Sequence, residues 1–360
     1  MDALFNMHKV KFTRLSELLG KYRSDVGSDT EVNFFINLEP IFRKITSTNI
    51  DDYLKVNTEK KNYELMSNII NLAAHYRLFF NRTKLKSKIY LYIGHPFDSR
   101  FAPTQLFSEY RTSYFEKFMR ETKGSVFGRS VTSIIEPTKM IMNYIEDVYF
   151  LTSDYIEPSM IPLILSEDFK KDSLNIILTT DRFEYQYVNY GFDILRSKKQ
   201  DSYYVTKENA IDIMKVEEKI VNQDSVSSNF IPFILSFIGD SYRNIPKVKR
   251  TGLGTLIKLL NTALENGIIT NDTTNIQLLE NIVSESVIDQ VRTNYSCIDI
   301  NYQMGFIPNS AKTRLKDQMV NKFDEFSLRK INEEFFHESP IMLMELAQYS
   351  NAKKPNVFGL

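Results

Sequence analysis

The chain has 360 residues, of which 42% are hydrophobic, and its 45 basic and 45 acidic side chains give a formal net charge of zero. This composition excludes a disordered chain and confines any nucleic-acid site to a local patch. The single cysteine, Cys297, excludes an internal disulfide framework and a thiolate metal cluster. No segment reaches the roughly 18 apolar residues of a membrane span, so we expect a cytoplasmic protein without a membrane partner.

The first part of the sequence alternates helix-like and strand-like segments. Apolar residues at helical spacing predict a helix over 2–22, and the polar run that follows predicts a linker. The runs VNFFI (32–36) and KIYLYI (88–93) predict two buried strands, with a helix over 60–82 between them. This order of strand, helix and strand is typical of a parallel sheet.

The second part of the sequence becomes increasingly helical. Residues 137–168 predict a helix that is broken near Pro158 and Pro162. NIILTT (175–180) predicts a third strand and YYVT (203–206) a fourth, after which the pattern is helical to the end of the chain. The sequence therefore predicts an α/β fold with a parallel central sheet and additional helices at both ends.

Two acidic residues follow strongly apolar segments. Asp181 ends the third predicted strand, and Asp240 follows IPFILSFI. The carboxyl ends of parallel strands meet at the edge of the sheet where α/β proteins bind ligands. Two carboxylates there can hold Mg²⁺ or Mn²⁺ together with substrate phosphates, although two acids at one edge also occur by chance.

The segment GDSYRNIPKVKRTGLGTLIKLL (239–260) contains a more specific pattern. It resembles G-D-x-x-D-N-I-P-G-V-x-G-I-G-x-x-T-A-x-x-L-L of the 5′-3′ exonucleases and flap endonucleases, a family with a PIN-like fold that includes phage ribonuclease H-type members. The residues in step are Gly239, Asp240, Asn244, Ile245, Pro246, Val248, Gly252, Thr255, Leu259 and Leu260. TTDRFEYQYV is similar to the family's S-x-D-x-D-x-x-Q-L-V through Asp181, Gln186 and Val188.

The resemblance runs from about residue 32 to about residue 320 and implies a domain organisation. We expect an N-terminal helical extension (1–30), a PIN-like α/β core of 5′-nuclease type with a helical arch (31–230), a helix-hairpin-helix region (231–310) and a C-terminal helical region (311–360). The family holds two divalent ions in a nest of carboxylates. Three acids of that nest are in register here, Glu157, Asp181 and Asp240, whereas Asn37, Phe183 and Arg243 stand where further acids are expected.

Arg243 decides between a working and a degenerate metal site. Two charges ~4 Å apart interact by about 4 kcal/mol at an effective dielectric of 20, so a guanidinium in the cluster opposes a metal ion. We therefore expect Arg243 to pair with Asp240 or Asp181 and no metal cofactor to be bound. In the alternative, an active enzyme would hold Mg²⁺ or Mn²⁺ at Asp181 and Asp240 with Glu157 and acids not in register, namely Asp98, Asp154 or Glu184.

The resemblance also implies contacts with DNA. A helix-hairpin-helix element binds the DNA backbone through main-chain N–H groups, often with a potassium ion, and its first glycine is replaced here. Basic and small residues gather in this segment: Lys247, Lys249, Arg250, Gly252, Gly254 and Lys258. Residues 110–129 correspond to the helical arch, where four side chains suit base stacking and phosphate contact as well as they suit a buried helical face: Tyr110, Arg111, Lys117 and Arg120.

Three functions remain open on the sequence. The favoured one is an accessory or structural, phage-like protein that binds DNA with impaired catalysis, located in a host cytoplasm or a virion if it is viral. The second is an active metal-dependent 5′-3′ exonuclease or flap endonuclease. The third is a scaffold that binds other proteins of a replication, transcription or virion assembly through 2–22 and 310–360, although these helices could equally cap the core.

Overall fold

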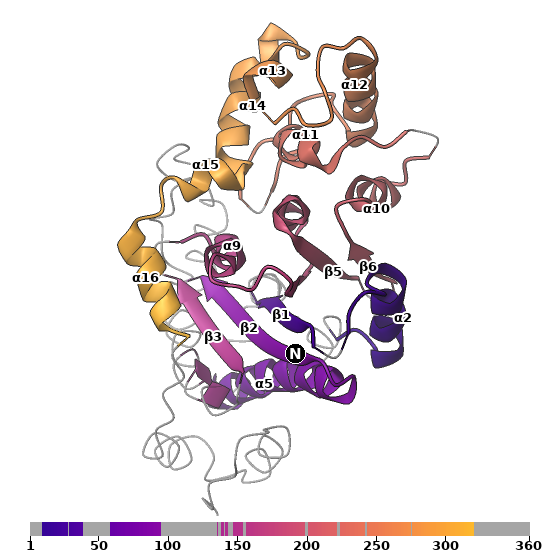
Figure 1. Ribbon diagram of the computed structural model, residues 1–360. Helices are drawn as coiled ribbons and strands as arrows, with labels where there is room; N and C mark the ends of the chain where they lie inside the picture. The colour runs from indigo at the N-terminus through magenta and orange to yellow at the C-terminus, as the bar shows by residue number, and fades with distance from the viewer. Residues whose placement is uncertain are drawn as a thin grey trace, which may run out of the picture.

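The computed structural model describes residues 9–27, 29–38, 58–94, 147–153, 156–198, 201–221, 224–241, 243–274 and 276–319, and a few residues between 135 and 142. Six strands form one sheet in the order β3-β2-β1-β4-β5-β6 (Figure 1). Only β5 and β6 pair in antiparallel fashion, and all other neighbours are parallel. The predicted α/β fold with a parallel central sheet is therefore confirmed. The strands are β1 (Glu31–Asn37), β2 (Lys86–Gly94), β3 (Val148–Ser153), β4 (Leu174–Thr179), β5 (Phe192–Lys198) and β6 (Asp201–Val205).

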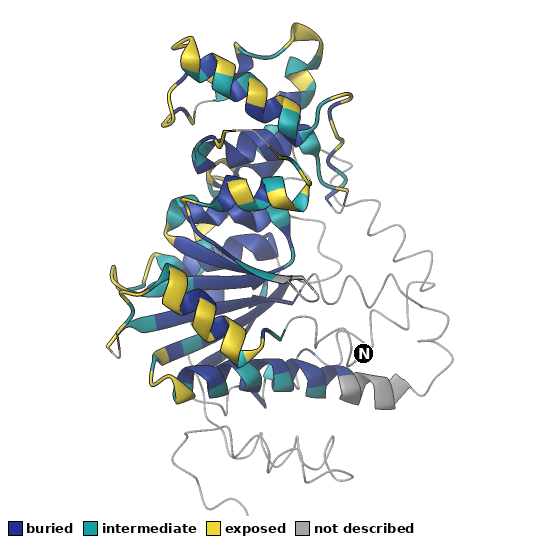
Figure 2. Cartoon of the chain, turned by 90° about the vertical axis from the view of Figure 1, so that its right-hand side faces the viewer, coloured by how far each residue is buried: buried dark blue, intermediate teal, exposed yellow. Residues whose placement is uncertain are grey.

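Side chains of successive strand residues pack on opposite faces of the sheet, as a strand of period two requires. Phe34 and Ile36 of β1 belong to a core with α2 (Phe12–Tyr22) and α5 (Thr58–Arg82), whereas Phe35 belongs to the core on the other face. That second face is covered by η1 (Pro158–Met160), α9 (Ile161–Ser166), η2 (Arg182–Tyr190) and α10 (Ala210–Glu217). Figure 2 shows the strands as buried between these layers.

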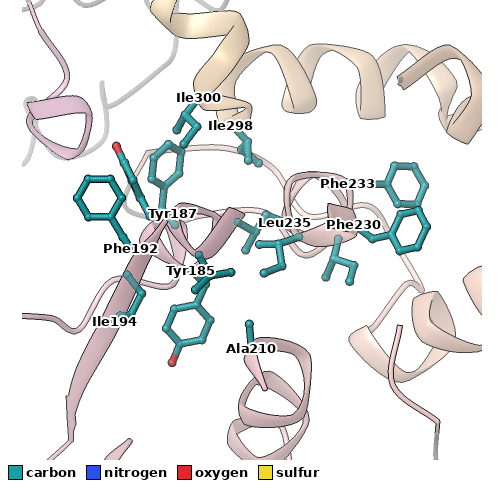
Figure 3. Packing of buried hydrophobic residues seen from close by; sticks show 14 of the residues in the cluster. Tyr185, Tyr187, Phe192, Ile194, Ala210, Phe230, Phe233, Leu235, Ile298 and Ile300 are labelled. Carbon is teal, nitrogen blue, oxygen red and sulfur yellow. The ribbon is translucent and has the colours of Figure 1, made fainter. Parts of the chain in front are cut away.

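The later helices share the hydrophobic core of the second face. They are η3 (Ser228–Phe230), α11 (Ile231–Ile238), α12 (Leu253–Glu265), α13 (Ile276–Glu280), α14 (Glu285–Ile298), α15 (Ile300–Met304) and α16 (Asn309–Asp317). Figure 3 shows Tyr187 and Phe192 close to Ile300, at the place where the sheet meets this helical region. Gln186 joins the two parts, because its Nε2 donates to the carbonyl of Ile298 at 3.1 Å and its Oε1 accepts from the backbone N–H of Ile300 at 3.3 Å.

Helices near the two ends of the described chain lie against the two outer strands of the sheet. Arg23, just after α2, forms a two-pronged ion pair with Asp193 of β5, and Arg14 donates to the carbonyl of Ser202 in β6. At the opposite edge, the side-chain amide of Gln318 donates to the carbonyl of Thr152 at 2.8 Å and accepts from its N–H at 3.0 Å. The apolar face of α2 is buried, so this helix caps the core.

Two sequence-based expectations were wrong. The predicted helix over 137–168 contains strand β3, whose VYFLTS sequence is aromatic and β-branched but is flanked by helix-like residues. Strand β5 was not predicted, because FDILRSK carries several polar residues. The first predicted helix, over 2–22, is observed from Phe12 to Tyr22; residues 9–11 are described but not helical, and residues 2–8 lie outside the described part of the chain. None of the described helices is long and apolar enough to cross a membrane.

Candidate functional site

Three acidic residues from separate segments meet beyond the carboxyl end of the sheet. Asp181 follows β4 and caps η2, because its Oδ1 accepts from the backbone N–H of Phe183 at 3.0 Å. Glu157 directly precedes η1 and is buried. Asp240 follows α11, so the apolar segment before it is a helix and not a strand. We call Glu157, Asp181 and Asp240 the acidic triad.

The guanidinium of Arg243 lies among all three acids of the triad. Its Nη1 is 2.6 Å from Asp240 Oδ2 and 3.0 Å from Asp181 Oδ2, and its Nη2 is 3.4 Å from Glu157 Oε1. The side chain is fully buried, and its guanidinium carbon lies 4.0 Å from the centre of the Phe183 ring. The planar guanidinium offers several N–H donors in a fixed fork, which is how one side chain can contact three carboxylates.

The local backbone directs Arg243 toward the triad. Asp240 and Ile245 exchange two backbone hydrogen bonds, at 3.0 and 2.8 Å, which close a tight loop. Gly239 has a φ of 68°, and a Cβ there would lie 2.7 Å from backbone atoms of Ile245 and Lys247, so only glycine fits. Asp240 Oδ1 accepts from the backbone N–H of Arg243 at 3.1 Å, an arrangement typical of aspartate in turns.

A second group of polar residues lies beside the triad, around Glu184, which the alternative prediction named as an acid not in register. Nδ2 of Asn37, the last residue of β1, donates to Oε1 of Glu184 at 2.8 Å. The hydroxyl of Tyr92 donates to the same oxygen at 2.7 Å. The pKa of Glu184 is raised to about 8, mainly because the side chain is completely buried and secondly because of the negative charge of Asp181. Burial therefore favours the protonated form of Glu184 in the folded protein.

The donor set does not fit a divalent ion. Mg²⁺ and Mn²⁺ require several charged oxygen ligands, but Arg243 already occupies the space among the triad and repels a second cation. Within the described ranges, no group of histidine, cysteine and acidic side chains has a geometry that could hold a metal. Asp98 and Asp154, the acids of the alternative prediction, lie outside the described residues.

The predicted DNA-binding segment forms an exposed loop between α11 and α12. Lys247, Lys249, Arg250 and Lys258 are exposed, whereas Val248 and Leu253 are buried and anchor the loop. We call residues 246–254 the basic hairpin. Its base is held by α14, where Asn294 Nδ2 donates to the carbonyl of Pro246 at 2.8 Å.

The tip of the basic hairpin leads directly into a helix N-terminus. Arg250 has a φ of 60°, and Gly252 is the N-cap of α12 in an extended conformation without a side-chain hydrogen bond. The first turn of α12 contains no acidic residue and includes Gly254. Such an N-terminus presents backbone N–H groups and a partial positive charge. The residues of the predicted arch, Tyr110, Arg111, Lys117 and Arg120, lie outside the described residues.

No family model matches the chain, and no curated protein matches its sequence. Among solved structures, the chain is similar to a bacteriophage T5 protein co-crystallised with metal ions, with 11% identity, a TM-score of 0.49, and 81% of this chain and 100% of the other covered. It is also similar to a bacteriophage T5 flap endonuclease variant in a pseudo-enzyme–product complex with DNA and metal ions, with 11% identity, a TM-score of 0.45, and 88% and 99% covered. A T5 5′-exonuclease with bound zinc has 9% identity and a TM-score of 0.43, with 81% and 100% covered. Similarity at this level says nothing about the chemistry of the site, which depends on the residues present in this chain.

Proposed function

We propose that this protein is a catalytically impaired, 5′-nuclease-like protein that binds duplex DNA through its phosphate backbone. The observation that carries the proposal is the position of Arg243, whose guanidinium contacts all three acids that are in register with the family's metal ligands. A nuclease of this type uses divalent ions to polarise the phosphodiester and to activate water. A site filled by a guanidinium has lost that chemistry, while the fold and the backbone-binding element persist.

The basic hairpin supports the binding half of the proposal. The chain as a whole is neutral, yet Lys247, Lys249 and Arg250 project from one short exposed loop beside the N-terminus of α12. Lysine, arginine and helix N-termini are the groups that contact DNA phosphates without reading sequence. We therefore expect binding that varies little with DNA sequence and weakens steeply with salt, as in an accessory or structural component of a phage-like system.

Salt dependence of duplex binding tests this half. Replacing Lys247, Lys249 and Arg250 together by alanine should reduce the slope of log K against log salt by about 3, since each phosphate contact contributes roughly 0.9. A matched control replaces three exposed lysines at other positions, Lys86, Lys171 and Lys207, and should leave the slope unchanged. Equal salt slopes for the two triple variants would refute the hairpin as the DNA site, and a wild-type protein that does not bind duplex DNA would favour the scaffold alternative.

Digestion of a flap substrate tests the catalytic half. With Mg²⁺ or Mn²⁺ we expect no cleavage above that of a blank reaction. Metal-dependent cleavage by the wild-type protein that disappears in Asp181→Ala would overturn the proposal of impaired catalysis. It would instead favour the active enzyme, with acids from outside the described residues completing the metal site.

A further inference from the structure

The contacts of Arg243 determine more than the loss of a metal. Asp181 Oδ2 and Asp240 Oδ2 both contact the same atom, Arg243 Nη1, so one guanidinium nitrogen holds two carboxylates together. Because Arg243 is tethered to the chain and buried, its charge is present in the site at every salt and metal concentration. A dissociable Mg²⁺ ion would have to lose part of its hydration shell to provide the same charge.

One acid of the triad, Asp240, lines an open cleft that also reaches the start of the basic hairpin. The cleft has a volume of about 500 Å³, and its lining includes Asp240, Asn244, Pro246 and Lys247. Asp240 is the most accessible acid of the triad, since 21% of its side chain is exposed, against 2% for Glu157. The carboxylate that Arg243 neutralises therefore lies on the same cleft as the first lysine of the hairpin.

We infer that Arg243 is the fixed counterion of the acidic triad, which frees nucleic-acid binding at the basic hairpin from any requirement for a divalent cation. Removing the guanidinium would make the site beside Asp240 more negative by one charge, so the cleft would repel phosphate more strongly and attract the ammonium group of Lys247 more strongly. Arg243 does not touch the ligand in this account and acts as a positioning residue. The prediction for DNA binding rests on the proposed function, whereas the prediction for metal binding does not involve DNA.

The DNA arm compares duplex binding in EDTA and in Mg²⁺. The wild-type protein should bind equally in both. Arg243→Met should bind about tenfold more weakly in EDTA, which is the effect of losing one phosphate contact at ~0.1 M salt, and should recover in Mg²⁺. Arg243→Lys keeps the charge and should behave like the wild type. Arg77→Met is the matched control, since it removes a buried arginine that pairs with Asp147, before β3, and should not create a Mg²⁺ requirement.

The metal arm measures the melting temperature with Mg²⁺ alone. Mg²⁺ should raise the Tm of Arg243→Met and leave that of the wild type unchanged. If Arg243→Met does not fold, Arg243→Gln, which is also uncharged but keeps N–H donors for the three carboxylates, replaces it in both arms. A wild-type protein that needs Mg²⁺ to bind DNA, or a variant whose Tm and DNA binding are both indifferent to Mg²⁺, overturns the inference. Failure of the wild type to bind duplex under either condition refutes the proposed function, and the metal arm then decides the counterion role alone.

Discussion

Replacing Glu184 by glutamine should make the protein more stable at alkaline pH. Glutamine retains a carbonyl oxygen that can accept from Asn37 and Tyr92, and it keeps the shape of the side chain. Its NH2 group stands in place of the second carboxyl oxygen and does not ionise. The variant therefore isolates the effect of burying an acid that must ionise as the pH rises.

The magnitude follows from the pKa of Glu184, which burial raises from 4.5 to about 8. Between these values the folded protein retains a proton that the unfolded chain has released. The free energy of unfolding therefore falls as the pH rises, by up to about 1.4 kcal/mol per pH unit, and the effect is complete above the folded pKa. The wild type should lose several kcal/mol across this window, whereas Glu184→Gln should lose none of this contribution.

Urea unfolding at pH 5, 6, 7 and 8, taken at roughly unit steps across the window, measures the difference. The variant should match or fall slightly below the wild type at the acid end and exceed it increasingly toward the alkaline end. Glu217→Gln is a useful comparison, because that buried glutamate pairs with Arg182 and Arg196, and its loss should lower stability. A stability difference between Glu184→Gln and the wild type that stays constant over this range would show that the group is ionised in the folded protein.

Further substitutions test the backbone and the two edges of the sheet. Gly239→Ala should destabilise the protein by about 2–4 kcal/mol in urea unfolding, because its Cβ would lie 2.7 Å from the backbone of Ile245 and Lys247. Gly20→Ala, on the exposed face of α2, should stabilise the protein by about 0.5–1 kcal/mol. The two variants should change the free energy of unfolding in opposite directions. An unchanged stability of Gly239→Ala would refute the close approach of the backbone to Gly239. Arg23→Met should cost about 2 kcal/mol and speed hydrogen exchange in α2, because it leaves the buried Asp193 without its guanidinium; unchanged exchange would contradict that anchoring role. Gln318→Ala should cost about 1–2 kcal/mol, and an equally stable variant would show that its two bonds to the outer strand are replaced by water.

The central strands and the motif around Asp240 could be predicted because their determinants are local. β1 and β2 each contain a short, mainly apolar run, and Arg243 lies three residues from Asp240 in one turn. The relation of Glu184 to its partners could not be found in this way. Asn37 and Tyr92 come from strands that are 147 and 92 residues away in sequence, and no spacing rule joins them. The only local signal was a glutamate among the aromatic residues of η2, and it indicated no more than an acid not in register.

Strand β5 illustrates a second limit of sequence patterns. Asp193 and Arg196 make it look like a polar segment, yet both are buried because their partners come from elsewhere in the chain. Asp193 is neutralised by Arg23, and Arg196 Nε lies 2.6 Å from Glu217. Alternation of hydrophobicity identifies a strand only when its polar positions face solvent, and in β5 they face ion-pair partners.

The amide of Gln318 presents one N–H donor and one carbonyl acceptor to Thr152, as the main chain of a neighbouring strand would. An outer strand with unpaired N–H and C=O groups can pair with a strand of another chain. The side chain of Gln318 occupies both backbone groups of Thr152 and therefore hinders such pairing at this position. With α2 lying against the opposite outer strand, growth of the sheet by recruitment of a further strand is disfavoured at both ends. The DNA contact that we propose would accordingly lie on a loop and a helix N-terminus, at the basic hairpin, and not on a sheet edge.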